Sequence, residues 1–512
     1  MAKNKNTDYT NIPKEKFEFY KRDESIHDKR LETKPVGYFK DAMRRFAKNK
    51  SSVVAAYIIL VLVLFAIFIP VFCENNYTKA ATDTTYLQYS KLLPKSHLFA
   101  WAGWDGCSDE TLSEGDYLRR EAIAAETGHN PTKEVYSSYA DEANGNAVYY
   151  KVRTDSYLKN GMIYLTLSAA DYESIQKWQN ETGVQVIYPA VDTSSLKVAT
   201  LKNDANIWYQ CTNKGQPKLD KNGNFTQIYK TKGADDYDSI RIEGDDGSYR
   251  YAVVGGTSTA KSYQVRVFTY TYFQYRYGHE PSFLFGTNAY GQDILTRLAK
   301  AVRFSILLAL GVSSINLFLG AVYGAVEGYY GGVIDLVMER ISDILSGVPF
   351  VVVVTLFQLH LASKVGVVVS FLFAFVLTGW IGMASRVRMQ FYRFKNQEYI
   401  LAARTLGARD SRLMFKHIFP NALGTIITGS ILMIPNVIFS ESNMTYLGIV
   451  NLDSATMSSL GSMLSAGKPL LSTYPHILFF PAVVISLLMI SFNLFGNGLR
   501  DAFNPSLRGT EE

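Results

Sequence analysis

Six long apolar runs constrain the fold of this 512-residue chain more than any other feature of it. A run of about 20 apolar residues can cross the hydrocarbon core of a bilayer as a helix, which satisfies its own backbone hydrogen bonds there. The third run is the shortest and carries Gln358 and His360, so a buried helix of a soluble domain is its alternative interpretation. We expect an all-α polytopic membrane protein with six transmembrane helices, at about 51–73, 304–326, 347–362, 365–384, 422–439 and 476–495.

Charge predicts the orientation. Residues 1–50 form a basic amino-terminal arm with 14 Lys/Arg against 8 Asp/Glu, and short basic flanks stay on the cytoplasmic side. Six crossings place the loop 386–421 on that side too, and its part 386–417 holds 8 Lys/Arg against 2 Asp/Glu. Both termini are therefore predicted to be cytoplasmic. Because the arm mixes acids with its bases and adjoins a span, we expect it to contact lipid and bind no nucleic acid.

A large insert separates the first two spans, over 74–282. It is net acidic, with 22 Lys/Arg against 26 Asp/Glu in 74–280, and long domains are translocated regardless of charge. Ser168 suits the cap of a short helix over 171–180. We predict an extracytoplasmic α+β domain, because β-branched and aromatic residues favour strands at 146–153, 162–167, 184–188, 249–254 and 262–277.

The chain lacks the motifs of a metal site or a nucleotide site. Its three cysteines form no metal-binding pattern, so no metal is expected. Cys107 and Cys211 both fall in the insert, where a disulfide can form; two free buried thiols are the alternative. The segment 461–468 resembles a phosphate-binding loop, but its glycines are one residue too far apart and Pro469 replaces the Ser/Thr that would hold magnesium. We expect this chain to bind no cofactor and catalyse no reaction.

The loop carries the strongest local signal, over 398–421. A first helix is predicted from Glu398 to Leu406, ended by a glycine, and a second from Asp410 or Ser411 to just before a proline. Two small alanines allow close approach of a partner, and large apolar side chains supply contacts. The candidate contact residues are Glu398, Ala402, Ala403, Leu406, Gly407, Leu413, Met414, Phe415, Ile418 and Pro420.

This stretch resembles the EAA loop of permeases in binding-protein-dependent ABC importers. Ala402, Ala403, Gly407, Ile418 and Pro420 fill the places of that pattern, whereas Leu401 stands where the family has an acid. The resemblance implies that the loop couples the chain to a separate ATPase subunit. With the acid missing, we expect coupling to depend on apolar packing.

Other segments narrow the resemblance to peptide and nickel permeases. Residues 285–297 are similar to the Gly-Thr-Asp-x-x-Gly-Arg-Asp signature of these permeases, with Asn288 and Gln292 as departures, and 39–49 resemble the C-type subunit of oligopeptide and dipeptide permeases. The resemblance covers 30–73 and 283–508 and leaves the insert unexplained.

The implied protein is half of a pore, with the type I ABC importer permease fold and a permease core over 283–512. The implied partners are a second similar permease, two ATPases that bind ATP and Mg²⁺, an extracellular solute-binding lipoprotein, and a peptide substrate at a bacterial plasma membrane. A permease for nickel or a sugar is the alternative, and a sensory membrane receptor is a third reading, disfavoured by the docking loop.

Two questions stay open from the sequence. Asn436 and Glu441 are candidate pore residues, because ionisable groups inside spans usually face a pathway; for Glu441 an external helix end is the alternative. The insert either docks the solute-binding protein or stabilises the complex as a decoration, and its tyrosines favour docking.

Overall fold

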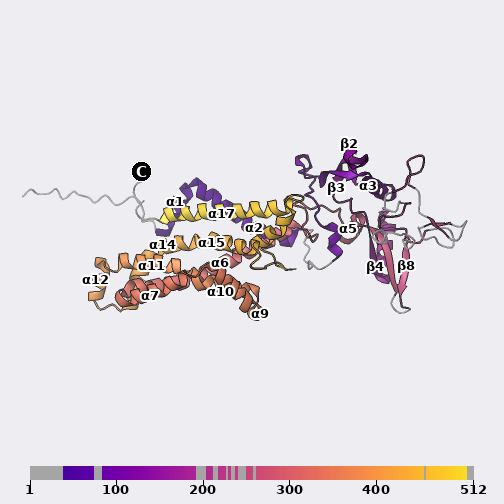
Figure 1. The fold of residues 1–512 in the computed structure, drawn as a ribbon. Coiled ribbons are helices and arrows are strands. Elements are labelled where there is room, and N and C mark those ends of the chain that lie inside the picture. The colour runs from indigo at the N-terminus through magenta and orange to yellow at the C-terminus, as the bar shows by residue number, and fades with distance from the viewer. Residues whose placement is uncertain are drawn as a thin grey trace, which may run out of the picture.

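A computed structural model describes residues 38–73, 84–191, 203–210, 217–225, 229–231, 237–239, 249–257, 261–454 and 457–503. Figure 1 shows an elongated molecule, with a bundle of helices at one end and the strand-containing insert at the other. The helices of the bundle are α1 (Tyr38–Lys48), α2 (Lys50–Phe72), α6 (Ile294–Tyr330), α7 (Gly332–Ser346), α8 (Phe350–His360), α9 (Ala362–Val365), α10 (Val367–Gly379), α11 (Ile381–Phe394), α12 (Glu398–Thr405), α13 (Asp410–Arg412), α14 (Phe419–Ile431), α15 (Met433–Tyr446), α16 (Leu460–Gly467) and α17 (His476–Phe503).

Five helical stretches of the described chain are long and apolar enough to cross a membrane. They are Lys50–Phe72, Ile294–Tyr330, Val367–Phe394, Asp410–Tyr446 and His476–Phe503. The pair α7 and α8 makes a sixth only if it counts as one span bent by 73°.

The predicted third span, 347–362, is therefore a crossing only as part of the bent pair of α7 and α8. Its residues form only the 11-residue helix α8 and the short α9. Pro349 precedes α8 and lies at the bend, because proline disfavours helical geometry in the residue before it and cannot donate a backbone hydrogen bond.

Glycines allow a close helix crossing between α6 and α11. A Cβ added to Gly324 would lie 2.1 Å from the carbonyl oxygen of Ala384, and one added to Gly320 or Gly328 would lie 2.7 Å from a backbone carbonyl oxygen at or beside α11. These three glycines recur every four residues and so share one face of α6. Small residues at such positions let two helix backbones pack directly.

The insert contains two main antiparallel sheets. The first has the order β1 (Cys107–Ser113), β3 (Ala147–Asp155), β2 (Thr132–Asp141). In the second, β9 (Lys261–Phe268) pairs with β4 (Met162–Ser168), β5 (Ile187–Tyr188) and β8 (Ala252–Gly256). A further hairpin joins β6 (Tyr229–Thr231) and β7 (Tyr237–Ser239). The helical elements are η3 (Thr84–Tyr89), η4 (Ala100–Ala102), α3 (Glu114–Thr127), η5 (Glu142–Asn144), α4 (Ala169–Thr182) and α5 (Thr269–Tyr277).

One predicted strand of the insert is too long. The run 262–277 forms a strand only to Phe268 and then turns into α5, whose residues Thr269 to Phe273 are all buried. The strand preference of aromatic residues reflects their fit to a half-buried sheet surface, and it depends on context. Here five consecutive residues are buried, and they form a helix. By contrast, the Ser168 hydroxyl accepts a hydrogen bond from Asp171 N and caps α4 as predicted.

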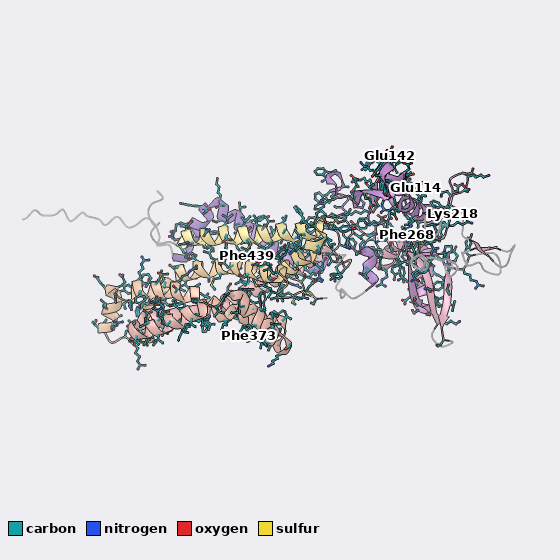
Figure 2. All side chains as sticks on the ribbon, in the orientation of Figure 1. Glu114, Glu142, Lys218, Phe268, Phe373 and Phe439 are labelled. Atoms are coloured by element: carbon teal, nitrogen blue, oxygen red, sulfur yellow. The ribbon has the colours of Figure 1, made fainter. Side chains whose placement is uncertain are left out.

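The surfaces of the two parts differ in Figure 2. Phe373 and Phe439 are exposed on the helices, at 48% and 57%, whereas Phe268 is completely buried in the insert. Glu114, Glu142 and Lys218 are exposed on the insert. An apolar outer surface suits a bilayer and a charged one suits water, so the bundle is the membrane part.

Candidate coupling loop and transport pathway

The loop forms the predicted first helix and glycine stop. Helix α12 ends at Thr405, and Gly407 has φ +83°, in the left-handed region where glycine is favoured. The N–H of Gly407 donates to the carbonyl of Arg404, and that of Ala408 donates to Ala403 at 3.1 Å. The chain thereby reverses direction between α12 and α13.

The predicted end of the second helix before Pro420 is wrong. Helix α13 runs into a π-helical segment, Leu413–Ile418, and then into α14, where Pro420 lies in the first turn. The N–H of Phe419 donates to the carbonyl of Met414, five residues back. A wider turn and a position in the first turn of α14 tolerate a residue that lacks an N–H. The loop is therefore continuous with the span that follows it.

The loop has one face turned towards its own chain. Leu413, Met414 and Ile418 are buried, and with Ile400 they pack against Tyr329, Phe391 and neighbouring apolar residues of α6 and α11. Three of the predicted contact residues, Leu413, Met414 and Ile418, thus make their contacts within this chain.

The other face is exposed. Leu406 is 88% exposed and Phe415 is 53% exposed. Glu398, Ala402 and Pro420 are also exposed, and Ala403 is half-buried. Leu401, the residue at the place of the missing acid, is 44% exposed on the same loop.

Hydrogen bonds fix the loop to α6. The Tyr329 hydroxyl donates to Asp410 Oδ1 at 2.5 Å, and Arg404 Nη2 donates to the Tyr329 hydroxyl at 3.3 Å. Tyr329 also lies 5.7 Å under the Arg404 guanidinium. One aromatic side chain thus connects the end of α12 and the start of α13 to the end of α6.

An ion cluster lies beside this contact. Arg388 of α11 pairs with Asp335 at 2.6 Å, with Glu339 at 2.7 Å and with Glu327 at 3.5 Å. The Tyr392 hydroxyl donates to Asp335 as well. This cluster joins α6, α7 and α11. Sequence reasoning missed it, although Asp335 and Glu339 are spaced by one helical turn and share a face.

The two candidate pore residues, Asn436 and Glu441, have different environments in the structure. Glu441 is fully buried in α15, where it accepts hydrogen bonds from Ser305 at 3.0 Å, Ser442 at 3.2 Å and Thr445 at 3.3 Å. It lines no cavity described here and lies at no exposed helix end. Asn436, in contrast, is exposed and lines a cavity of about 320 Å³.

That cavity combines an apolar wall with several polar groups. Its polar side chains are Asn316, Thr378, Arg386, Asn436 and Ser440, and Phe350, Phe375, Met383, Met433 and Val437 supply the apolar part. The volume is at the lower end of the range for small-ligand sites.

Two of these polar groups have spare hydrogen-bonding capacity. The Asn316 side chain is 1% exposed, and its Oδ1 has no hydrogen-bond partner in the described chain. Its amide packs against Gly379, where an added Cβ would lie 2.3 Å from Nδ2. Arg386 is exposed and makes one long bond, 3.4 Å to the carbonyl of Gly429. The sequence signal for Asn316 was a polar residue inside a span.

The cysteine and metal expectations concern the insert. Cys107 is a free thiol whose Sγ lies 3.8 Å from the carbonyl oxygen of Asp105, and burial raises its pKa to about 12. Cys211 lies outside the described residues. Among the described residues, no three His, Cys, Asp or Glu side chains are grouped to hold a metal ion.

Membrane-length helices, with an exposed Gly-turned loop fixed to the end of their bundle, are the architecture of a multi-pass membrane protein. The family model for the binding-protein-dependent transport system inner membrane component matches 302–509, and the model for the N-terminal transmembrane domain of oligopeptide transport permease C matches 37–94. The insert after residue 94 lies outside both matches.

Two relatives of this chain are peptide permeases, in agreement with the family models. The chain is 43% identical over 224 residues to the oligopeptide transport system permease protein OppC of Bacillus subtilis, covering 44% of this chain and 72% of the relative. It is 40% identical over 225 residues to the dipeptide transport system permease protein DppC of the same organism, covering 44% and 69%. This chain therefore belongs to the ABC importer permeases of the C type, and it is a transporter component rather than an enzyme.

A solved structure of the inward-facing MetNI methionine ABC transporter aligns with 41% of this chain and 96% of that chain. The identity is 14% and the TM-score is 0.34, a likeness too low to carry an argument.

Proposed function

We propose that this chain forms half of the translocation pore of an ATP-driven importer of peptides in a bacterial plasma membrane. A second, homologous permease forms the other half. Two ATPase subunits, which bind ATP and Mg²⁺, dock on the loop, and an extracellular solute-binding lipoprotein delivers the peptide. The names of the relatives, oligopeptide and dipeptide permeases, support the choice of substrate.

The observation that carries the proposal is the division of the loop into two faces. Leu413, Met414 and Ile418 fasten the loop to its own bundle, while Leu406 and Phe415 remain exposed on it. Leu406 is the most exposed large apolar residue in the described chain. A rigid helix pair with apolar side chains turned outward fits a groove of a partner subunit. Movement of that partner is then passed to the spans as a rigid-body displacement.

The cavity at Asn436 is the proposed part of the pathway. Arg386 offers a guanidinium to a peptide carboxylate, and Asn316 and Asn436 offer amide groups to the peptide main chain. The apolar wall accepts side chains without selecting among them. Such a site binds the features that all peptides share.

Transport in proteoliposomes tests the proposal. The complex that copurifies with this chain is reconstituted with its solute-binding protein, and ATP-dependent uptake of a labelled peptide is compared with that of nickel and of a labelled sugar. We expect uptake of the peptide alone. If nickel or the sugar is taken up and the peptide is not, that solute is the substrate and the peptide assignment is wrong. If none of the three shows ATP-dependent uptake, the proposal is overturned.

A further inference from the structure

The insert contains a short apolar loop that is exposed and has a well-defined backbone conformation. We call residues 96–104 the Trp101 loop. From Leu98 to Trp104 it contains only apolar residues and glycine, and Trp101 and Leu98 are 85% and 79% exposed. Both exceed every other large apolar residue that the structure describes in the insert. Such exposed apolar clusters mark interaction sites.

The backbone of the Trp101 loop is held in one conformation. Lys95 and Asp105 form an antiparallel bridge that closes it, and Ser96 N donates to the carbonyl of Trp104 at 2.8 Å. The tip is the single turn η4, which ends at Gly103 with φ +88°. Phe99 is 45% exposed, and its ring lies edge-on to that of Trp104 at 5.5 Å. The outward positions of Leu98 and Trp101 are therefore built into the fold.

Aromatic contacts attach this loop to the end of the last membrane helix. The Trp104 ring lies edge-on to Phe480 at 5.8 Å and to Phe285 at 6.0 Å, and Phe285 stacks on Phe480 at 4.0 Å. Phe480 belongs to α17, a membrane span, and its neighbour Phe479 is 58% exposed. In Figure 1 the end of α17 reaches the insert. The Trp101 loop thus lies where that span leaves the bilayer.

We infer that the Trp101 loop is a membrane anchor: Leu98 and Trp101 enter the headgroup region of the leaflet on the insert side. Tryptophan is enriched at this depth, because its ring is apolar and its indole N–H is polar. Ring contacts link the exposed Phe479 to Phe480 at 5.6 Å, and Phe480 to Trp104 of the loop at 5.8 Å. Lys95, Ser96 and Asp105 lie at the base of the loop, and the segment from Leu98 to Trp104 that projects from this base carries no charged residue. The anchor would fix the insert relative to the bundle.

Spin labels in the assembled importer test the anchor. The three cysteines are replaced by serine, and labels are placed at Leu98→Cys or Trp101→Cys, with Tyr136→Cys and Val254→Cys as controls. The controls are 48% and 60% exposed and lie on strands β2 and β8. Collisions with oxygen, which partitions into lipid, are compared with collisions with a water-soluble nickel chelate. The complex is placed in lipid nanodiscs without the solute-binding protein.

We expect positions 98 and 101 to lose accessibility to the nickel chelate and keep accessibility to oxygen, with the reverse at both controls. Labels at 98 and 101 as open to the chelate as the controls would show that the loop lies in water and overturn the inference. Labels shielded from both reagents would show a protein contact and overturn it equally.

A second measurement needs no cysteine replacement. Tryptophan fluorescence of the native complex is compared with that of a Trp101→Tyr complex in bilayers with and without brominated phospholipid. We expect the emission lost on substitution to be the part that bromine quenches. If that emission is unaffected by bromine, Trp101 does not reach the bilayer. Neither measurement depends on which solute is transported.

Discussion

Replacing Leu406 separates docking from folding. Its side chain is 88% exposed in the isolated chain, so Leu406→Ala removes almost no internal contact. If the partner ATPase buries it, the lost transfer free energy is about 2 kcal/mol, within the usual range for a fully buried leucine. Since each 1.4 kcal/mol is a factor of ten, the ATPase should bind roughly 25-fold more weakly.

Leu413→Ala is the matched control, because the same side chain is removed from the opposite face of the same loop. Leu413 is completely buried against α6 and α11, and truncation of such a residue costs about 2–5 kcal/mol of folding stability. We therefore expect Leu413→Ala to lower the thermal unfolding temperature of the permease, and Leu406→Ala to leave that temperature unchanged.

The assay titrates purified ATPase subunits onto the permease pair in nanodiscs and measures binding alongside thermal unfolding. ATP hydrolysis stimulated by the loaded solute-binding protein is recorded at saturating ATPase. Unchanged ATPase affinity in Leu406→Ala, with intact folding, would refute the idea that the exposed face docks the partner.

The other predictions concern the turn, the pathway, the ion cluster and the insert. Gly407→Pro should abolish transport-linked ATP turnover, because proline fixes φ near −65° whereas Gly407 has φ +83°, and Gly407→Asn should retain it; equal loss in both would show that the backbone shape is not the cause. Leu401→Glu should be tolerated, since Leu401 is 44% exposed, and a coupling defect in an intact complex would contradict coupling by packing. Gly379→Ala should reduce peptide uptake without loss of ATPase binding, because the added methyl displaces the Asn316 amide, and uptake at the wild-type rate would remove Asn316 from the pathway. Arg388→Met should cost about 1–3 kcal/mol of stability, measured by thermal unfolding, because it leaves the mostly buried Asp335 and Glu327 without their ion-pair partner; an unchanged unfolding temperature would count against the cluster. Deleting residues 107–268 should abolish uptake that depends on the solute-binding protein if the insert docks it, and uptake as fast as in the intact complex would favour the decoration reading.

Local backbone signals in the sequence were accurate where the chemistry is local. A glycine with positive φ at Gly407 and a serine cap at Ser168 both follow from rules that concern a few neighbouring residues. The bend at Pro349 was within reach of the same rules, but the hydropathy of the run that contains it conceals the break. Hydropathy measures composition, and it does not register where a helix changes direction.

Contacts between distant segments were beyond such rules. Leu413 and Leu406 look alike in sequence, and only the approach of α6 and α11 decides which of them is buried. The same holds for Arg388, whose three acidic partners come from two other helices. Asn436 and Glu441 were both predicted as pore residues because they are polar residues inside spans. The packing of the helices distinguishes them: Asn436 lines a cavity, whereas Glu441 is buried among hydroxyl groups.

The continuity of the helix after the loop has a mechanical consequence. From Asp410 to Tyr446 the chain forms one helical stretch, so Asp410 and Asn436 are about 39 Å apart along its axis, at 1.5 Å per residue. The Tyr329 bond to Asp410 holds the outer end of this stretch on α6, and Asn436 lines the cavity near its other end. A partner that displaces the exposed face of the loop would act on a lever whose far arm borders the proposed pathway. Two places between them depart from a regular α-helix: the π-helical segment Leu413–Ile418, and Leu432, where α14 ends and α15 begins. If the stretch moves as one body, the cavity at Asn436 changes shape with the loop. If it bends at Leu413–Ile418 instead, the buried Leu413 and Ile418 must repack against α6 and α11.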